Sequence, residues 1–304
     1  MQYAIQVAID SLSLGSIYAL AALGIGLIFG VMRLINFAHG ELITMGAYSL
    51  IIPSAAVIPT LFVGAFPWPL LIVSVVVILV IVALAMERIV FRPIRGADPA
   101  TLLIASFSLS YFLQYTMLLV YGGRPKGIDI GSSLTESIQI GSAEVAKIDI
   151  VTILATVVLM LALASFMKWT SIGIQIRAAT QDFRMARMLG VKANAVIAGA
   201  FAVSGMLAGV VSLLVISRVG ALEPRLGVNM ALYGFVSTVV GGMGSLTGPV
   251  AGGFAVGIAS GIIQAILPDH MRPTRDAFVF AIVIVLLLVR PEGIVRLKSS
   301  KERV

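Results

Sequence analysis

A short polar stretch inside a long apolar part of the chain holds the residues best suited to chemistry. Asn36, His39 and Glu41 lie close together there, between one apolar run and the next. Polar and ionisable side chains in apolar surroundings are costly, so they usually face a cavity, a partner group or a solute pathway. One histidine and one glutamate supply too few ligands for a metal ion. We expect these three residues to border a substrate path or its gate, while a simple inner loop between two spans is the alternative, and we expect no metal site.

A second unusual stretch is rich in glycine and lies nearer the C-terminus. Glycines spaced by four share one face of a helix and let a neighbouring helix approach closely. The same run could instead form a tight turn between two half-length helices that line a path. No Lys-Ser or Lys-Thr pair follows it, so it is not a phosphate-binding loop, and any ATP hydrolysis would belong to another chain. The residues concerned are Gly241, Gly242, Gly244, Gly248 and Gly252.

The overall composition indicates which elements hold these two stretches. Hydrophobic residues make up 59% of the chain and charged residues 12%, about half the charged share of a soluble globular protein. Several apolar runs reach the roughly 20 residues that a helix needs to cross a bilayer. The chain is therefore predicted to be a polytopic protein surrounded by membrane lipid, which excludes a soluble enzyme, a nucleic-acid binder and a disordered chain. It has no cysteine, so disulfides and thiolate chemistry are excluded too.

We predict an all-α membrane helix bundle that forms a single domain over residues 1–304, with about nine spans and a range of about eight to ten. Helices are the expected form because unpaired backbone groups are costly in hydrocarbon. The segment 229–243 is short for a complete crossing and could be a re-entrant or broken helix that lines a path. The predicted spans are 8–30, 40–60, 68–86, 100–121, 149–167, 195–217, 229–243, 247–267 and 276–290.

Basic residues predict which loops are cytoplasmic, because lysine and arginine accumulate in short cytoplasmic loops. Two thirds of the 21 lysines and arginines fall in one set of loops, which includes 168–194 and the C-terminal end. That set is predicted to be cytoplasmic. With an odd number of crossings, the N-terminus and the loop 122–148 are then outside.

The predicted cytoplasmic loop 168–194 has a pattern of its own. Its segment 171–192 is basic and has no glycine or proline between residues 174 and 189, so it is predicted to be a helix too polar to lie in lipid. Such a helix could dock a partner protein. It could also rest on the membrane surface against anionic lipids.

Four stretches of sequence together carry a resemblance to a known family. The chain resembles the permeases of branched-chain amino-acid ABC importers, the LivH/LivM class, over nearly its whole length. The stretches are Leu14-Gly15-Ser16-Ile17-Tyr18-Ala19-Leu20 leading into Leu34-Ile35-Asn36-Phe37-Ala38-His39-Gly40-Glu41; Phe91-Arg92-Pro93-Ile94-Arg95; Arg177-Ala178-Ala179-Thr180-Gln181-Asp182 continuing to Ala186-Arg187-Met188-Leu189-Gly190-Val191; and the glycine run with Arg290-Pro291-Glu292-Gly293.

The resemblance implies a division of labour among several chains. Two permease subunits, identical or paralogous, would form one path in the bacterial inner membrane, and a periplasmic solute-binding protein would deliver the solute to them. Two cytoplasmic ATPase subunits would hold ATP and magnesium, so this chain would need no cofactor and would not be an enzyme. The solute would be a branched-chain or other amino acid, or a similar small polar molecule such as an amide or urea. Alternating access driven by ATP would carry it inward.

The resemblance also implies contacts for these partners. The loop 168–194 looks like the segment that couples a permease to its ATPase, through Arg177, Ala178, Ala179, Arg184, Arg187 and Gly190. Arg177 departs from the family pattern, since many such loops carry glutamate there. The loop 122–148 would be periplasmic. The binding protein could dock on Arg124, Lys126, Arg218 and Arg225, although these could equally be solvated loop charges.

Two other functions stay open on the residues alone. A stand-alone secondary transporter could couple to protons through His39 and Glu41 and would need no ATPase. A membrane scaffold with no path is the third hypothesis.

Overall fold

The computed structural model describes residues 2–140, 143–243, 245 and 247–295, and these form an all-α polytopic bundle, which confirms the predicted fold class. Six helices in this part of the chain are long and apolar enough to cross a membrane. They are α1 (Gln2–Met32), α3 (Trp68–Met86), α4 (Pro99–Tyr121), α6 (Lys147–Trp169), α9 (Ala193–Val219) and α11 (Gly248–Ile266). Three further helices are shorter: α2 (His39–Tyr48), the apolar α10 (Leu226–Gly241) and α12 (Arg275–Val289). The number of spans and the sidedness of the termini stay predictions.

The predicted span 40–60 is the main departure from the expected helices. Helix α2 ends at Tyr48, and the chain from 49 to 67 is irregular except for the short 3₁₀ turn η1 (Val63–Ala65). Pro53 and Pro59 lie in this region, and proline lacks the N–H that a helix needs and clashes with the preceding turn. The prediction of one continuous helix over 40–60 was therefore wrong, and α2 is a half-length helix with irregular chain on both sides.

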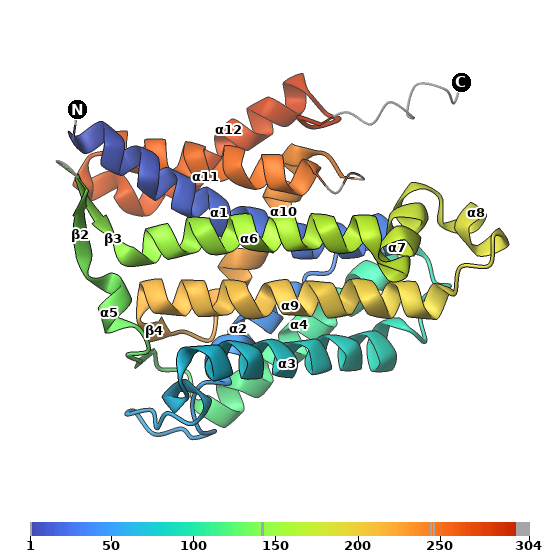
Figure 1. Cartoon of the computed structure of the whole chain (residues 1–304), viewed down its shortest axis with the longest axis horizontal. Helices are drawn as coiled ribbons and strands as arrows, with labels where there is room; N and C mark the ends of the chain where they lie inside the picture. Colours follow the sequence, from blue (N-terminus) through green and yellow to red (C-terminus); the bar gives the residue numbers. More distant parts are fainter. Residues whose placement is uncertain (1, 141–142, 244, 246, 296–304) are drawn as a thin grey trace.

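The helices differ strongly in how much of their surface the chain itself buries. Of the most apolar stretch of each helix, 89% is buried in α1 and 78% in α9, against 17% in α6 and 6% in α4. Helix α1 packs against α9, α10 and α11, while α9 also packs against α2 and α3. Figure 1 shows α3, α9 and α6 running side by side along the bundle. Helices α1 and α9 are therefore the centre, and α4 and α6 present most of their surface to lipid or to other chains.

The contact between α1 and α11 is made backbone to backbone. Gly253 and Gly257 of α11 face Ala19 and Gly15 of α1, and a Cβ atom on either of these α11 glycines would overlap main-chain atoms of α1. Glycines four residues apart lie on one face of a helix, so the two helices can approach along several turns. This contact fixes the N-terminal helix in the centre of the bundle.

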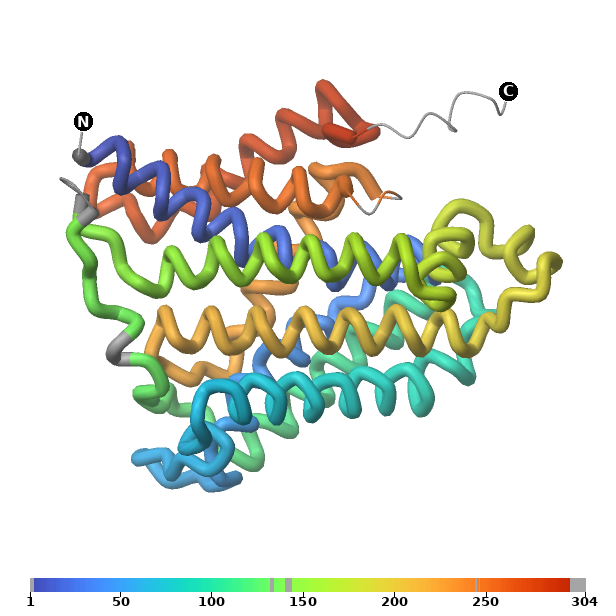
Figure 2. Tube along the Cα trace, in the orientation of Figure 1, coloured from blue at the N-terminus to red at the C-terminus, as the bar shows by residue number. Residues whose placement is uncertain are grey.

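Small elements mark the two ends of the bundle. One end, the hairpin end, carries the antiparallel strands β2 (Ser137–Ile140) and β3 (Ala143–Ala146), helix α5 (Ser132–Thr135), the pairing of β1 (Lys126–Gly127) with β4 (Ala221–Leu222) and the 3₁₀ turn η3 (Asp269–Thr274). The opposite end, the α8 end, carries α7 (Ser171–Gln181), α8 (Phe183–Met188) and the π-helical turn η2 (Glu87–Phe91) that extends α3. Figure 2 follows the chain between these ends. The loops 122–148 and 168–194 thus lie at opposite ends, as the predicted topology requires.

The segment 171–192 is not the single helix that its composition indicated. Helix α7 ends at Gln181, and Asp182 adopts an extended conformation whose carboxylate accepts the backbone N–H of Met185 at 2.9 Å. Aspartate favours this N-cap position, so it starts α8 as a second helix and turns the chain there. Thr170 caps α7 in the same way through the backbone N–H of Gly173 at 3.0 Å.

The glycine contact predicts a large cost for one added methyl group. We expect Gly257→Ala to destabilise the bundle by about 1–3 kcal/mol, because overpacking forces backbone to move. Thermal unfolding of the purified variant in detergent measures the effect. Gly96→Ala is the matched control, since an added Cβ there meets no atom within 4 Å. Equal unfolding temperatures for the two variants would contradict this account of α1 and α11.

Candidate functional site

Asn36 shapes the irregular segment that leads into α2. Its side-chain Oδ1 accepts the backbone N–H of Ala38 at 3.1 Å, and the residue is fully buried. Asparagine commonly stabilises a turn by bonding its own backbone two residues on. Its Nδ2 has no hydrogen-bond partner among the described residues. Asn36 therefore sets the start of α2 and keeps an unused donor in the interior.

His39, the first residue of α2, lies in the packed interior between α1 and α9. Its Nδ1 is 2.9 Å from Oγ of Ser204 on α9. Its ring fills the space over Gly24 of α1, where a Cβ atom would overlap the imidazole. The sequence predicted His39 beside a path, and the structure places it as the side chain that holds α2 against both central helices.

Glu41 points from α2 toward the outer helix α4. Its Oε1 accepts a hydrogen bond from Oγ of Ser110 at 3.1 Å, and its Oε2 has no hydrogen-bond partner among the described residues. The side chain is buried. A buried carboxylate oxygen without a partner is costly. Of the three predicted path residues, Glu41 is the one joined to a residue that lines a cavity.

That cavity is a groove between α4 and α10, which we call the aromatic groove. It has a volume of about 710 Å³. The ring of Phe37 stacks on Phe107 with centroids 4.2 Å apart and lies 5.5 Å from Phe235. The lining residues are Phe37, Phe107, Ser110, Tyr111, Gln114, Tyr115, Arg225, Val228, Asn229, Ala231, Leu232 and Phe235.

Sequence reasoning missed most of this groove, although α4 carries a signal for it. Phe107, Tyr111 and Tyr115 recur every four residues, and Ser110 and Gln114 do the same. Residues four apart share one helix face. A face that mixes aromatic and polar side chains on an apolar helix is unusual for a surface that meets only lipid, so the pattern could have marked α4 as a wall of the groove.

The four basic residues predicted to dock a binding protein have different surroundings. Lys126 is buried, donates to the carbonyl of Ser54 and lies over the ring of Tyr121. Arg218 pairs with Asp149 of α6 at 2.9 Å and donates to Oγ of Ser13 of α1 at 2.9 Å. Arg124 and Arg225 are exposed. Arg124 and Arg225 therefore present their charge most fully to a separate chain, whereas the Arg218 side chain is 28% exposed.

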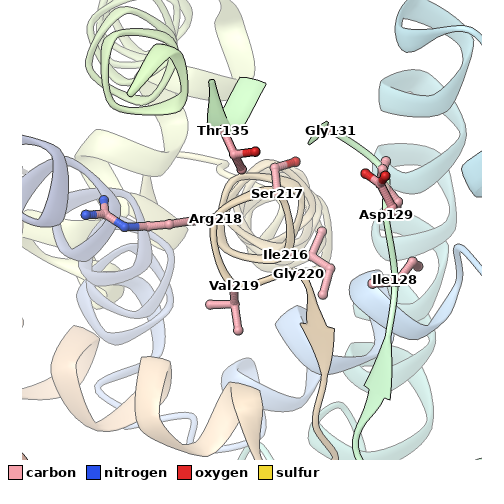
Figure 3. Close-up of a pocket in the computed structure, with 10 residues that line it drawn as sticks. Ile128, Asp129, Gly131, Thr135, Ile216, Ser217, Arg218, Val219 and Gly220 are labelled. Atoms are coloured by element: carbon pink, nitrogen blue, oxygen red, sulfur yellow. The ribbon is translucent and has the colours of Figure 1, made fainter. Parts of the chain in front are cut away.

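Figure 3 shows the direction in which the Arg218 side chain leaves α9. Its side chain leaves α9 on the side away from Asp129, while Thr135 and Ser217 lie at the rim of a small pocket of about 220 Å³. The pocket sits where α9 ends at Gly220, which takes the left-handed conformation with φ of 65°. Glycine is favoured there because it has no Cβ.

The α8 end presents the residues predicted to contact an ATPase. Arg177, Ala178, Arg184, Arg187 and Gly190 are exposed, whereas Ala179 is buried against the bundle. Three apolar side chains beside the arginines are also exposed: Met185 at 54%, Met188 at 69% and Leu189 at 80%. Exposed apolar side chains grouped with charge are typical of an interaction site.

The glycine run lies where α10 meets α11. A Cβ on Gly241 would overlap the carbonyl of Gly248, and one on Gly252 would overlap that of Ser237. Gly242 has φ of 106°, which favours glycine. The segment after α12 pairs with this turn, since the N–H groups of Ile294 and Val295 donate to the carbonyls of Val240 and Gly241. Gly244 lies outside the described residues.

No group of three or more His, Cys, Asp or Glu side chains that could hold a metal ion occurs among the described residues. The geometry is that of a helical bundle with a polar, broken helix beside a groove and an exposed basic tip. Such an arrangement suits passage and docking.

Comparison with known proteins gives the family. Residues 7–288 match the family described as branched-chain amino acid transport system / permease component. The chain is 32% identical to the high-affinity branched-chain amino acid transport system permease protein LivH of Escherichia coli K12, over 96% of this chain and 95% of that protein. LivH of Salmonella typhimurium is 31% identical over the same shares. BraD of Pseudomonas aeruginosa, of the same description, is 29% identical over 95% of each chain.

No solved structure matches the chain. The resemblance of the sequence motifs, the all-α membrane bundle and the match over almost the full length agree. The chain belongs to the family of permease components of branched-chain amino-acid ABC transport systems, and it is a transport protein whose ATPase is a separate subunit.

Proposed function

We propose that this chain is one half of the membrane path of an ATP-driven importer that moves branched-chain amino acids, or similar small solutes such as other amino acids, amides or urea, into a bacterium. The observation that carries the proposal is the family match over residues 7–288. The relatives named LivH and BraD are described as high-affinity permease proteins for branched-chain amino acids. The proposed location is the inner membrane.

The aromatic groove and Glu41 support a path along this chain. A solute that leaves water for the membrane needs polar partners on the way, because unpaired polar groups are costly in apolar surroundings. Ser110 lines the groove and joins it to Glu41. Asn36 sets the start of α2, and His39 holds this helix against the central helices. In the proposal these two residues position α2 beside the path, and Glu41 lies nearest to it.

A second permease subunit, a copy or a paralogue, would cover the open side of the path. Helix α4 forms one wall of the groove and the chain itself buries only 6% of its apolar stretch. The exposed face includes Tyr111, Phe112 and Tyr115. Aromatic residues are enriched in protein interfaces, so this face suits contact with another membrane subunit.

Two cytoplasmic ATPase subunits, which would hold ATP and magnesium, are proposed to dock at the α8 end. The exposed Met185, Met188 and Leu189 supply apolar contact, and Arg184 and Arg187 supply charge next to them. Arg177, Ala178 and Gly190 complete the exposed surface, while Ala179 holds α7 on the bundle. ATP binding would move this tip and, through α7, the central helices that α7 contacts.

A solute-binding protein is proposed to dock at the hairpin end. Arg124 is exposed there and could meet acidic side chains, whereas Arg225, also exposed, lines the aromatic groove. Such rim charges act mainly on the rate of association.

The stand-alone proton-driven transporter is not supported by the comparisons. The relatives LivH and BraD are described as permease proteins of a branched-chain amino acid transport system. His39 is also fixed by Ser204 and Gly24 in the interior.

The docking proposal predicts the effect of reversing charge at the α8 end. Replacing Arg184 and Arg187 with Glu should lower co-purification of the ATPase subunits about tenfold or more. The new carboxylates would repel the acidic groups of the ATPase with which the two arginines are proposed to pair. Pull-down from membranes through a tag on this chain measures it. Arg124→Glu at the hairpin end is the control and should leave ATPase binding unchanged. Full ATPase recovery with both reversed arginines would rule out contact at this tip.

The path proposal predicts that charge at Glu41 matters more than its shape. Glu41→Gln keeps the side chain's size and its acceptor for Ser110, and we expect ATP-dependent leucine uptake to fall about tenfold. Uptake into proteoliposomes that contain the whole complex measures the change, with assembly checked by gel filtration. Glu144→Gln on the exposed hairpin is the same chemical change away from the path. Uptake that equals this control would remove Glu41 from the path.

A further inference from the structure

The aromatic groove changes in character along its length. Arg225 directly precedes α10 at the hairpin end, and Phe235 lies ten residues further along that helix, about 15 Å away at 1.5 Å per residue. Helix α4 ends at Tyr121, shortly before β1 at the hairpin end, so along this helix Tyr115 lies nearer to that end than Phe107 does. The groove thus has a charged mouth and an aromatic inner end.

The inner end is closed by three rings from three different elements. Phe37 comes from the irregular segment before α2, Phe107 from α4 and Phe235 from α10. Phe37 contacts the other two rings, with centroids 4.2 Å and 5.5 Å away. This cluster offers an apolar cage and contains no charge.

The mouth offers polar groups of several kinds. The guanidinium of Arg225 has no salt bridge to any residue that the structure describes. Gln114 and Asn229 supply amide oxygens and N–H donors on opposite walls, and Tyr111 and Tyr115 add ring faces. Arginine pairs well with a carboxylate, while amide oxygens and aromatic faces attract an ammonium group.

From this arrangement we infer that the aromatic groove is a binding site for one free α-amino acid with an apolar side chain. The α-carboxylate binds Arg225, the ammonium group lies among Asn229, Gln114 and the tyrosine rings, and the side chain points inward to the Phe37–Phe107–Phe235 cage. The inference rests on the proposed function and deepens it. The permease itself would select the solute, in addition to the selection made by the solute-binding protein.

Other occupants fit the groove less well. A lipid chain would gain nothing from Arg225, Gln114 and Asn229, since it has no groups for them. A helix of a partner subunit packed into the groove would have no groups specifically placed to form hydrogen bonds with the side-chain amides of Gln114 and Asn229. The volume of about 710 Å³ lies in the range of about 300–1,000 Å³ of small-molecule sites. An acidic amino acid would place a second carboxylate in the uncharged cage, which is costly.

The absence of cysteine from the chain allows a direct test. Leu232→Cys places a thiol in the groove without touching its polar groups, and Leu161→Cys places one on the exposed outer surface of α6. The complete complex is reconstituted in nanodiscs, and alkylation of this chain is followed by mass spectrometry with L-leucine, with L-glutamate or with neither. We expect leucine to slow alkylation of the Leu232→Cys variant severalfold, glutamate to have little effect, and the Leu161→Cys variant to react at one rate throughout.

Arg225 supplies the second arm of the test. In the Leu232→Cys background, Arg225→Gln should raise the leucine concentration that gives half protection by about tenfold or more, as loss of a charged hydrogen bond predicts. Arg88→Gln, an exposed arginine outside the groove, should change nothing. Val228→Cys, also in the groove, replaces the first variant if that one does not assemble.

The failures of the two proposals give different results. If leucine protects neither groove cysteine while the complex still takes up leucine with ATP, the site is wrong and the proposed function stands. Protection that survives Arg225→Gln also overturns the site. If the unmodified complex takes up no solute of the proposed class with ATP, the proposed function itself is wrong. Protection by added lipid alone would make the groove a lipid surface and would overturn the amino-acid site.

Discussion

The contact between Gly40 of α2 and Gly227 of α10 is the constraint on which the candidate site depends. A Cβ atom on either glycine would overlap the backbone of the other, and the N–H of Gly227 donates to Oγ1 of Thr44 at 3.0 Å. The two short helices therefore touch along their main chains. This contact holds Glu41, the residue after Gly40, and Phe37, three residues before it, close to the wall that α10 forms. If either residue had a side chain, α2 and α10 would separate and the aromatic groove would lose its shape.

The fold class followed from composition because the bilayer allows few alternatives. An apolar chain with 12% charged residues must satisfy its backbone internally, and helices do that. The internal breaks were harder to predict. Hydropathy over 40–60 is that of a span, yet the helix ends at Tyr48, because prolines act on the backbone and hydropathy does not record them. In the same way, Asp182 divides 171–192 through a cap that depends on local geometry.

The candidate site could be predicted only in part, for a related reason. Residue type indicated that Asn36, His39 and Glu41 were special, but not which of them faces a cavity. That depends on partners far along the chain, Ser204 for His39 and Ser110 for Glu41. Likewise, Arg218 and Arg225 are both arginines near the hairpin end. Arg218 forms a salt bridge with Asp149, whereas Arg225 is exposed. Such partners are brought together by tertiary packing, and no local pattern of residue types in a single sequence predicts them.

The two walls of the aromatic groove are constrained to different degrees. Helix α10 is held on one side by α11, through Gly241 and Gly252, and on another by α1. Phe37, by contrast, belongs to an irregular segment that follows Arg33, a non-glycine residue with φ of 55°. Segments with few backbone hydrogen bonds change conformation at lower cost than packed helices. A change that opened the inner end of the groove would therefore move Phe37 away from Phe107 and Phe235, while α10 and its polar groups stayed in place.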